Sequence, residues 1–181
     1  MQVLKEEVRD RIIKSARKEF KKSGFEKASM RRIANTADMT VGNLYRYYTN
    51  KEDLFSAIIN DLLVEIKKMK SDMPEDIEVR LNYFLENFKE LQKNYKSEWL
   101  ILFGGSSGTK YQKAANDVLN ILQKTIREVL EKNGKRSDIA IPLASSIIYG
   151  LNTILKTSGR TGELADDFLN YMMVNISSGV A

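Results

Sequence analysis

The sequence predicts an all-α protein with about nine helices. Two observations support this fold class. Apolar residues recur at helical spacing along nearly the whole chain, and only two prolines, Pro74 and Pro142, interrupt its 181 residues. No stretch alternates between apolar and polar residues in the manner of a β-strand. With 43% hydrophobic and 29% charged residues, the chain has the composition of a globular protein with a substantial core.

The N-terminal region predicts one longer helix followed by two short ones. Apolar residues four apart place one face on a helix from about residue 5 to 23, and Gly24 is the expected residue after its end. Ser29 and Thr40 are expected N-caps of two short helices, joined by a tight turn at residues 37–39. Helices this short are not stable alone, so the first helix is expected to pack against them.

The rest of the chain continues as longer amphipathic helices. Asn50 and Asp53 have the spacing of a capping box and open a long helix that ends before Pro74. The glycine- and serine-rich residues 104–108 form the clearest loop. The apolar stripes of the later helices lie within residues 77–91, 99–103, 111–130, 144–155 and 164–176.

Charge is distributed unevenly along the chain. Residues 1–51 hold 13 Lys and Arg against six Asp and Glu, whereas residues 52–181 hold 16 against 18. A small basic unit attached to a near-neutral body is typical of a protein that binds a polyanion. The alternative, a basic surface that meets only solvent, stays open at this point.

The sequence contains no cysteine and no histidine. Disulfides, thiolate nucleophiles, Cys or His zinc sites and Ser-His-Asp catalysis are therefore excluded. Residues 104–108 follow no strand, which argues against a phosphate-binding glycine loop. We expect no enzyme activity, no metal and no cofactor. The charged N-terminus and the shortness of the apolar stretch 139–151 predict a cytoplasmic protein without a membrane span.

The order of apolar, glycine and aromatic positions over residues 8–60 resembles the DNA-binding domain of TetR-family transcriptional regulators. The run GNLYRYYTNK at residues 42–51 is the most specific part of this resemblance. Two residues depart from the family pattern. Asp38 stands in the turn where the family usually has glycine, and Thr40 replaces the commoner serine. Aspartate tolerates left-handed backbone better than most residues, so we expect the turn to form.

The resemblance implies a helix-turn-helix whose second short helix enters the major groove. Val41, Gly42 and Asn43 then face base edges, and Lys51 is interpreted as a phosphate contact because a cation opposes the helix dipole there. Arg46 faces phosphate or solvent, and either Tyr45 or Tyr48 packs in the core, with Tyr48 favoured. The residues implied to contact DNA are Ser29, Arg31, Thr40, Val41, Gly42, Asn43, Tyr45, Arg46, Tyr47 and Lys51.

The same resemblance implies a C-terminal domain that binds a small ligand and forms a homodimer through the last two helices. A small apolar or amphipathic ligand is expected. The alternative stays open that these residues form an ordinary core, as an aromatic stripe at helical spacing more often does. The expected ligand contacts are Tyr83, Phe84, Phe88, Trp99, Phe103, Asn116, Tyr149 and Asn152. The expected dimer contacts are Ile147, Leu151, Ile154, Phe168 and Met172.

These features together predict a homodimeric transcriptional repressor that a small ligand releases from a pseudo-palindromic DNA operator. The expected domains are a DNA-binding domain at residues 1–50, a connecting helix at 51–73 and an effector and dimerisation domain at 74–181. The alternative is a non-specific or architectural DNA-binding protein without an effector. An enzyme that uses Glu or Lys chemistry has no motif in its favour.

Overall fold

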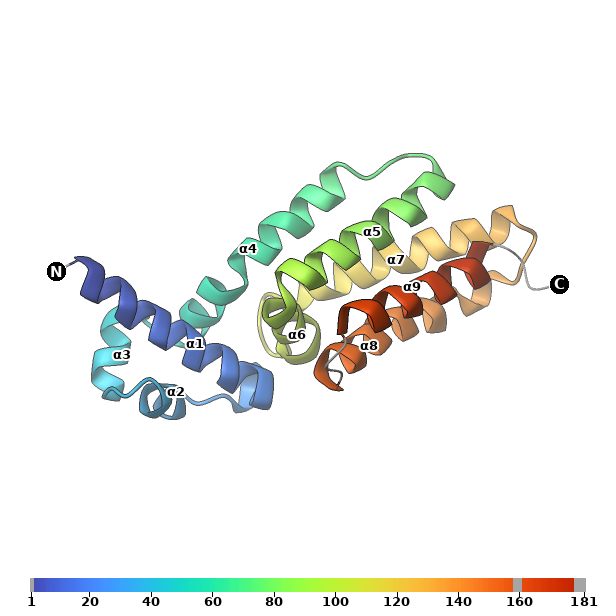
Figure 1. Cartoon of the computed structure of the whole chain (residues 1–181). Coiled ribbons are helices and arrows are strands. Elements are labelled where there is room, and N and C mark those ends of the chain that lie inside the picture. The colour runs from blue at the N-terminus through green and yellow to red at the C-terminus, as the bar shows by residue number, and fades with distance from the viewer. Residues whose placement is uncertain (1, 158–160, 178–181) are drawn as a thin grey trace. The chain divides into compact units, whose positions relative to one another are not determined.

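The structure, a computed structural model, describes residues 2–157 and 161–177, with the side chains of 2–4 and 161 left out (Figure 1). This described part forms nine α-helices and one 3-10 helix and contains no strand, which confirms the predicted all-α class. The helices are α1 (Gln2–Lys27), α2 (Met30–Thr36), α3 (Val41–Tyr47), α4 (Lys51–Ser71), α5 (Ile77–Asn94), α6 (Lys96–Gly105), α7 (Gln112–Lys132), α8 (Ala140–Thr157) and α9 (Thr161–Ser177), with the 3-10 helix at Ser137–Ile139.

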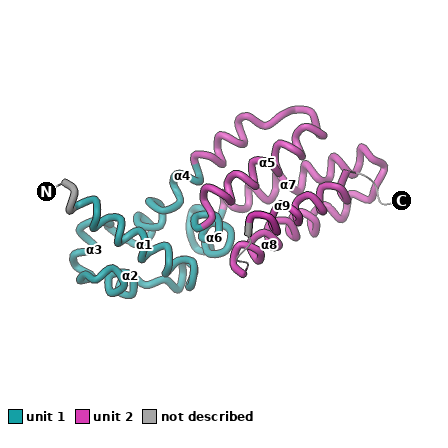
Figure 2. The backbone as a smooth tube through the Cα atoms, viewed as in Figure 1, with its two compact units in different colours: residues 1–63, 97–112 teal, residues 64–96, 113–181 magenta. Residues whose placement is uncertain are grey.

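The chain divides into two compact units, coloured separately in Figure 2. Unit 1 comprises residues 1–63 and 97–112, and unit 2 comprises residues 64–96 and 113–181. This division differs from the expected domains because most of α6 joins the N-terminal helices. The carboxylate of Glu98 on α6 pairs with Arg17 on α1, a contact that pattern analysis of single helices does not reveal.

The core of unit 1 is built where α1 packs on α2 and α2 packs on α3. Ile12, Ala16 and Phe20 are buried along one face of α1, as their spacing predicts. Phe20 meets Phe55 of α4 edge-on, with ring centroids 5.1 Å apart. Because α2 and α3 have seven residues each, their stability depends on this shared core.

The predicted turns and caps of unit 1 form as expected. Gly24 has φ 67° and interrupts the helical backbone of α1, and Asp38 has φ 54° in the turn between α2 and α3. Ser29 and Thr40 cap α2 and α3 through their side-chain oxygens. Asn50 accepts a hydrogen bond from the Asp53 N–H at 2.8 Å, which confirms the predicted start of α4.

Unit 2 gathers α5, α7, α8 and α9 around a second core. α8 packs along α9, and α5 contacts α9 (Figure 1). Phe84 and Phe88 of α5 are fully buried with ring centroids 4.4 Å apart. Arg80 of α5 donates to the carboxylate of Glu128 on α7 at 2.7 Å, so a charged hydrogen bond also joins these two helices.

A close contact between α8 and α9 lies at Gly150. A Cβ at this position would lie 2.5 Å from Cζ of Phe168, which requires the ring or the helix to move. Phe168 therefore packs onto α8 of its own chain. The ring is half-buried, so its expected place at a dimer interface stays a prediction.

One helical stretch among the described residues, Ser137–Thr157, is long and apolar enough to pass a length-and-composition test for a membrane span. Its mean hydropathy is 1.4 and 39% of it is buried. This stretch extends beyond the apolar residues 139–151 at both ends. Core helices of globular proteins pass the same test, and seven residues of α8 are buried in unit 2.

We expect Gly150→Ala to lower the free energy of unfolding by about 1–3 kcal/mol, since the added methyl group overlaps the Phe168 ring. Urea unfolding followed by circular dichroism measures the loss. Ser146→Ala, an exposed position one turn earlier on α8, serves as the control and should change stability by less than about 0.5 kcal/mol. Equal stability of both variants would contradict the close contact.

Candidate functional site

The N-terminus of α3 presents a compact set of polar groups. Thr40 is exposed and its Oγ1 accepts a hydrogen bond from the Asn43 N–H at 3.2 Å. This bond uses the oxygen of the hydroxyl as an acceptor and leaves its O–H to donate outward. The N–H groups of the first helical turn lack intrahelical acceptors, and the helix dipole favours an anion at this end. An incoming phosphate would find these donors together.

Three consecutive residues open α3 beside this cap. Val41 and Asn43 are half-buried, whereas Gly42 is exposed, and a Cβ placed on it would meet no atom within 4 Å. Gly42 therefore has no steric neighbour in the fold and no positive φ to explain the glycine. A glycine in a helix costs about 1 kcal/mol relative to alanine. Fold stability therefore does not account for the glycine, and its expected role at DNA stays a prediction.

The aromatic residues of α3 differ in exposure. The side chain of Tyr45 is 47% exposed, and Tyr48 is half-buried. Burial raises the pKa of the Tyr48 hydroxyl despite the opposing charge of Arg9. Tyr48 is thus the more deeply packed of the two, as the sequence favours. Tyr47 is half-buried and Arg46 is exposed, so the outer side of α3 combines a cation with two accessible phenol rings.

Both arginines at the N-terminus of α2 are exposed, but one of them is paired within the chain. Arg32 Nε donates to the Glu19 carboxylate at 2.8 Å, and the Ser29 N–H donates to the same carboxylate at 3.2 Å. Partial burial opposes ionisation of Glu19, but these hydrogen bonds hold its pKa below its usual value. Arg31 is exposed. Of the two arginines, Arg31 is therefore the one available to an external phosphate or base.

The structure gives Lys51 a different environment from the one predicted. Its Nζ donates to the carbonyls of Phe25, Glu26 and Ala28 at 2.6, 3.1 and 3.2 Å, and lies 4.5 Å from the centroid of the Phe25 ring. An ammonium has three donors, and all three are directed at the end of α1. These contacts give the cation a structural purpose that the sequence argument did not foresee, and the phosphate contact of Lys51 stays a prediction.

A basic hollow on unit 1 was not predicted from the sequence. Arg11, Lys14 and Lys18 of α1 line a depression of about 300 Å³ together with residues 36–38 at the turn before α3. The three cations lie three or four residues apart and so share one face of α1. This spacing is visible in the sequence, but the fold is needed to bring it beside the turn.

The residues expected to contact a ligand are distributed over both units. Trp99 and Phe103 belong to unit 1, whereas Phe84 and Phe88 are core residues of unit 2. Asn116 is exposed, and Tyr149 is 66% exposed. Asn152 is buried on α8. Of the eight residues, Tyr83 lines a described cavity, a space of about 250 Å³ between α4 and α5.

The residues expected at a dimer interface differ in burial. Ile147 and Leu151 are fully buried in the core of their own chain, and Phe168 covers Gly150. Ile154 and Met172 are half-buried. The exposed apolar side chains of these two helices are instead Ile141 and Tyr149 on α8 and Leu164, Tyr171 and Val174 on α9.

The N-terminal part of the chain is similar in sequence to known transcriptional regulators. Residues 12–58 match the family model of bacterial regulatory proteins, tetR family. An HTH-type transcriptional regulator from Staphylococcus aureus is 37% identical over 87 residues, which are 44% of this chain and 47% of that protein. UidR from Escherichia coli is 39% identical over 59 residues, 33% of this chain and 30% of UidR. The chain thus matches less than half the length of these curated relatives.

Solved structures match nearly the whole chain. A TetR-family regulator from Streptomyces coelicolor has a TM-score of 0.71 at 15% identity, covering 94% of this chain and 90% of that one. AibR in complex with isovaleryl coenzyme A and operator DNA has a TM-score of 0.59 at 19% identity, with 91% and 97% covered. At such identities the likeness shows a shared fold.

Replacing Lys51 by methionine removes the charge but keeps an apolar stem of similar length. We expect the variant to lose about 2–3 kcal/mol of unfolding free energy, because carbonyls at the end of α1 lose a charged donor. Lys67→Met, at an exposed position of the same helix, is the matched control and should stay within about 0.5 kcal/mol. Similar urea midpoints for both variants would argue against the structural role of Lys51.

Proposed function

We propose, from the place of residues 12–58 in the tetR family of bacterial regulatory proteins, that this chain is a cytoplasmic, sequence-specific DNA-binding transcriptional regulator. In this proposal it acts as a homodimeric repressor that a small ligand releases from a pseudo-palindromic operator. One observation at the N-terminus of α3 carries the proposal. Gly42 follows the capping residue Thr40 by two positions, and a Cβ placed on Gly42 would meet no atom of the protein within 4 Å.

The proposed DNA contacts follow from this geometry. α3 lies in the major groove with its N-terminal residues toward the base edges. Asn43 pairs with the N6 and N7 of an adenine, and Val41 contacts a thymine methyl group. Thr40 and the first backbone N–H groups of α3 hold a phosphate, as does Arg31 from α2. Gly42 lets the helix backbone come close to the DNA.

Phosphate binding draws on the charge of unit 1 as well as on these contacts. Residues 1–51 have a clear excess of basic residues, and Arg46, Tyr45 and Tyr47 project from the accessible side of α3. Each phosphate neutralised releases counterions, so binding weakens steeply as salt rises. Ser29 contributes mainly by capping α2, through the 3.4 Å bond from the Arg32 N–H, and so positions Arg31.

A homodimer would bury the apolar side chains that α8 and α9 expose. Tyr149 and Tyr171 are 66% and 69% exposed, and Val174 is also exposed. Residues 164, 171 and 174 are spaced so that they share one side of α9. Aromatic residues are enriched at protein interfaces, which supports this face of α8 and α9 as the dimer surface.

A ligand site in unit 2 would complete the regulator. AibR and a FadR from Bacillus subtilis, both similar in fold, have been solved with isovaleryl coenzyme A and stearoyl-CoA. In this chain, unit 2 contains several cavities lined by α4, α5, α8 and α9. A ligand releases DNA only to the extent that it binds a DNA-incompetent conformation more tightly than the competent one.

Selection of binding sites from a random duplex pool, at near-physiological salt, tests the proposal with purified protein. Enrichment of an inverted repeat whose half-sites lie about one helical turn or a multiple of it apart supports a dimeric sequence-specific regulator. Salt-sensitive binding without an enriched sequence would instead support the alternative, a non-specific or architectural DNA-binding protein. Absence of DNA binding would contradict both.

Gly42→Ala separates DNA contact from folding. The added methyl group meets no atom of the protein and improves helix propensity, so thermal stability should stay equal or rise. Affinity for the selected operator should fall at least tenfold, because the methyl group holds the α3 backbone away from the DNA. Gly162→Ala, at the same second position of α9 and equally open, should leave DNA affinity unchanged. If Gly42→Ala binds the operator with unchanged affinity, the α3 backbone does not approach the DNA closely at this position.

Tyr171→Glu tests the dimer surface. The charge is placed on an exposed position, so the helical circular dichroism should be retained while sedimentation detects monomers. Tyr171→Phe keeps the ring and should remain dimeric. Leu151→Glu, in the core of the chain, should unfold the protein instead. A Tyr171→Glu variant that sediments as a dimer would rule out this face.

A further inference from the structure

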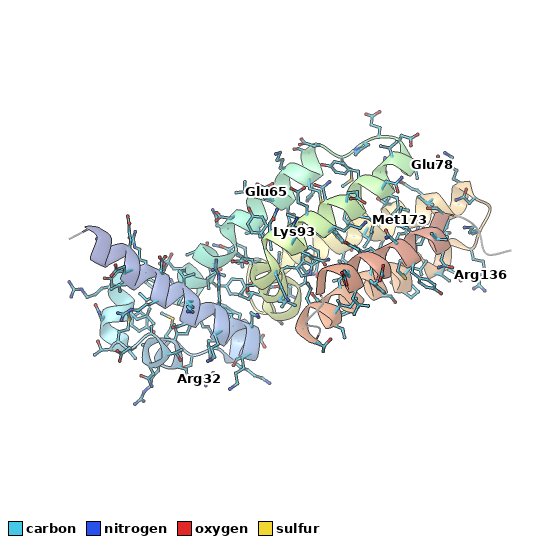
Figure 3. All side chains as sticks on the ribbon, viewed as in Figure 1. Arg32, Glu65, Glu78, Lys93, Arg136 and Met173 are labelled. Atoms are coloured by element: carbon cyan, nitrogen blue, oxygen red, sulfur yellow. The ribbon has the colours of Figure 1, made fainter. Side chains whose placement is uncertain are left out.

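One face of α1 carries three cations beside the turn between α2 and α3. Arg11, Lys14 and Lys18 are exposed, and within the described residues none of them makes an ion pair or a hydrogen bond. Arg32 of α2, labelled in Figure 3, is also exposed but pairs with the carboxylate of Glu19. The charge of Arg32 is thus met within the chain, whereas the charge of the three α1 cations is available to an external anion.

Ser15 lines the basic hollow beside these cations. The residue is 7% exposed, so it is more than nine-tenths buried. In the part of the chain that the structure describes, its Oγ makes no hydrogen bond. The fully enclosed side-chain atoms without a partner there belong to Arg17 and Gln92, so the Ser15 Oγ keeps accessible surface. Because buried polar groups are nearly always hydrogen-bonded, this hydroxyl is an open donor that the hollow presents to a ligand.

The turn at residues 36–38 lines the other side of the hollow. The backbone N–H groups of Ala37 and Asp38 donate to the carbonyls of Ile33 and Asn35, so neither N–H group is open to a ligand. Thr36 is exposed and adds a second hydroxyl. Recognition in the hollow therefore depends on side-chain donors, which are two hydroxyls, two ammonium groups and one guanidinium.

The charges around the hollow favour a doubly charged anion. The three cations line it together with one carboxylate, that of Asp38, so positive charges exceed negative ones by two. Asp10 lies one turn before Lys14 but forms no ion pair with it in the described structure. A phosphate monoester carries about 1.5 to 2 negative charges at neutral pH, whereas each phosphodiester of the DNA backbone carries one. The charge of the lining therefore matches the monoester.

A terminal phosphate also suits the shape of the hollow. The hydroxyl of Ser15 is recessed, since the residue is almost fully buried. A phosphodiester is linked to a sugar on both sides within a stiff duplex, whereas a terminal phosphate projects freely and reaches a recessed donor. None of the residues that line the hollow belongs to the positions proposed to contact DNA on α2 and α3. The lining is therefore separate from that surface.

We propose that the basic hollow binds a small molecule through a terminal phosphate group. The Ser15 hydroxyl donates to one phosphate oxygen, and the guanidinium of Arg11 and the ammonium of Lys14 pair with the others. Lys18 and Thr36 complete the donor set. This inference goes beyond the proposed function, because binding in the hollow requires neither DNA nor a ligand in unit 2.

Calorimetric titration of the full chain with phenyl phosphate and phenyl sulfate tests the ligand class. The two probes share a ring and a tetrahedral anion, but at about pH 7.5 the phosphate carries close to two negative charges and the sulfate one. We expect phenyl phosphate to bind with a Kd at least tenfold lower. Equal or tighter binding of phenyl sulfate, or no detectable binding of phenyl phosphate, would overturn the assignment.

Lys14→Met locates the phosphate on α1. The variant removes one cation from the hollow and keeps an apolar stem, so the Kd for phenyl phosphate should rise at least tenfold. Lys5→Met is the matched control, because Lys5 is exposed on the opposite side of the same helix. It removes the same charge and should change the Kd less than twofold. Equal weakening by both variants would indicate general attraction to a basic unit and contradict a site in the hollow.

Ser15→Ala separates the hydroxyl from folding. The change breaks no hydrogen bond in the described structure and places a stronger helix former in α1, so Tm should stay equal or rise. The Kd for phenyl phosphate should rise at least fivefold, because the phosphate loses a recessed donor. A lower Tm with an unchanged Kd would show that Ser15 has a structural role only and would overturn the proposed contact.

Asp38→Asn should strengthen binding. Asparagine tolerates the left-handed backbone of this turn, where φ is 54°, so the fold should be retained. Loss of the carboxylate from the lining should lower the Kd for phenyl phosphate at least threefold. An unchanged or higher Kd would contradict a phosphate group in the hollow.

The DNA backbone is the rival occupant, and the salt dependence of duplex binding distinguishes it. If a backbone phosphate filled the hollow, Lys14→Met would lower the slope of log binding constant against log salt by about one. That result, together with no binding of phenyl phosphate, would assign the hollow to DNA and overturn the proposal. A chain that binds phenyl phosphate selectively but binds no DNA would keep the hollow as proposed and refute the regulator.

Discussion

The C-terminal end of α1 is the point on which unit 1 depends. The helix is interrupted at Gly24, and its last carbonyls turn toward the ammonium of Lys51 on α4. On the other side, a Cβ at Gly105 of α6 would lie 3.1 Å from Cα of Gly24, so the two backbones nearly touch. A cation at a helix C-terminus is favourable both for the dipole and for the open carbonyls. This junction fixes where α1 ends and thereby the platform against which the short α2 and α3 fold.

Local features of this unit follow from the sequence, whereas the junction does not. The caps at Ser29, Thr40 and Asn50 and the left-handed turn at Asp38 depend on residues within four positions of one another, which a reading of local spacing captures. The bonds of Lys51 join residues more than 20 positions apart, so its local context, a cation in a first helical turn, points toward an external anion. Only the tertiary fold brings the carbonyls at the end of α1 within hydrogen-bond distance of the Lys51 ammonium.

The C-terminal helices illustrate a second limit. Their apolar stripes predict that α8 and α9 pack, and they do. An apolar stripe does not show whether each residue packs in the core of its own chain or against a partner chain, since both contacts require apolar side chains. Ile147 and Leu151 fall in the core, while Tyr149, which was expected at a ligand, faces outward. The deciding information is the position of Phe168 over Gly150, because this contact sets how α8 is rotated relative to α9.

Two residues break local rules of stability, and the structure treats them differently. Lys51 opposes its own helix dipole but is compensated by carbonyls of α1, which give the cation a role within the fold. Gly42 weakens a seven-residue helix, and a Cβ placed on it would meet no atom of the fold within 4 Å. Broken rules therefore indicate function only where the folded chain supplies no compensation. By that criterion Gly42 is the position at which a partner molecule is expected.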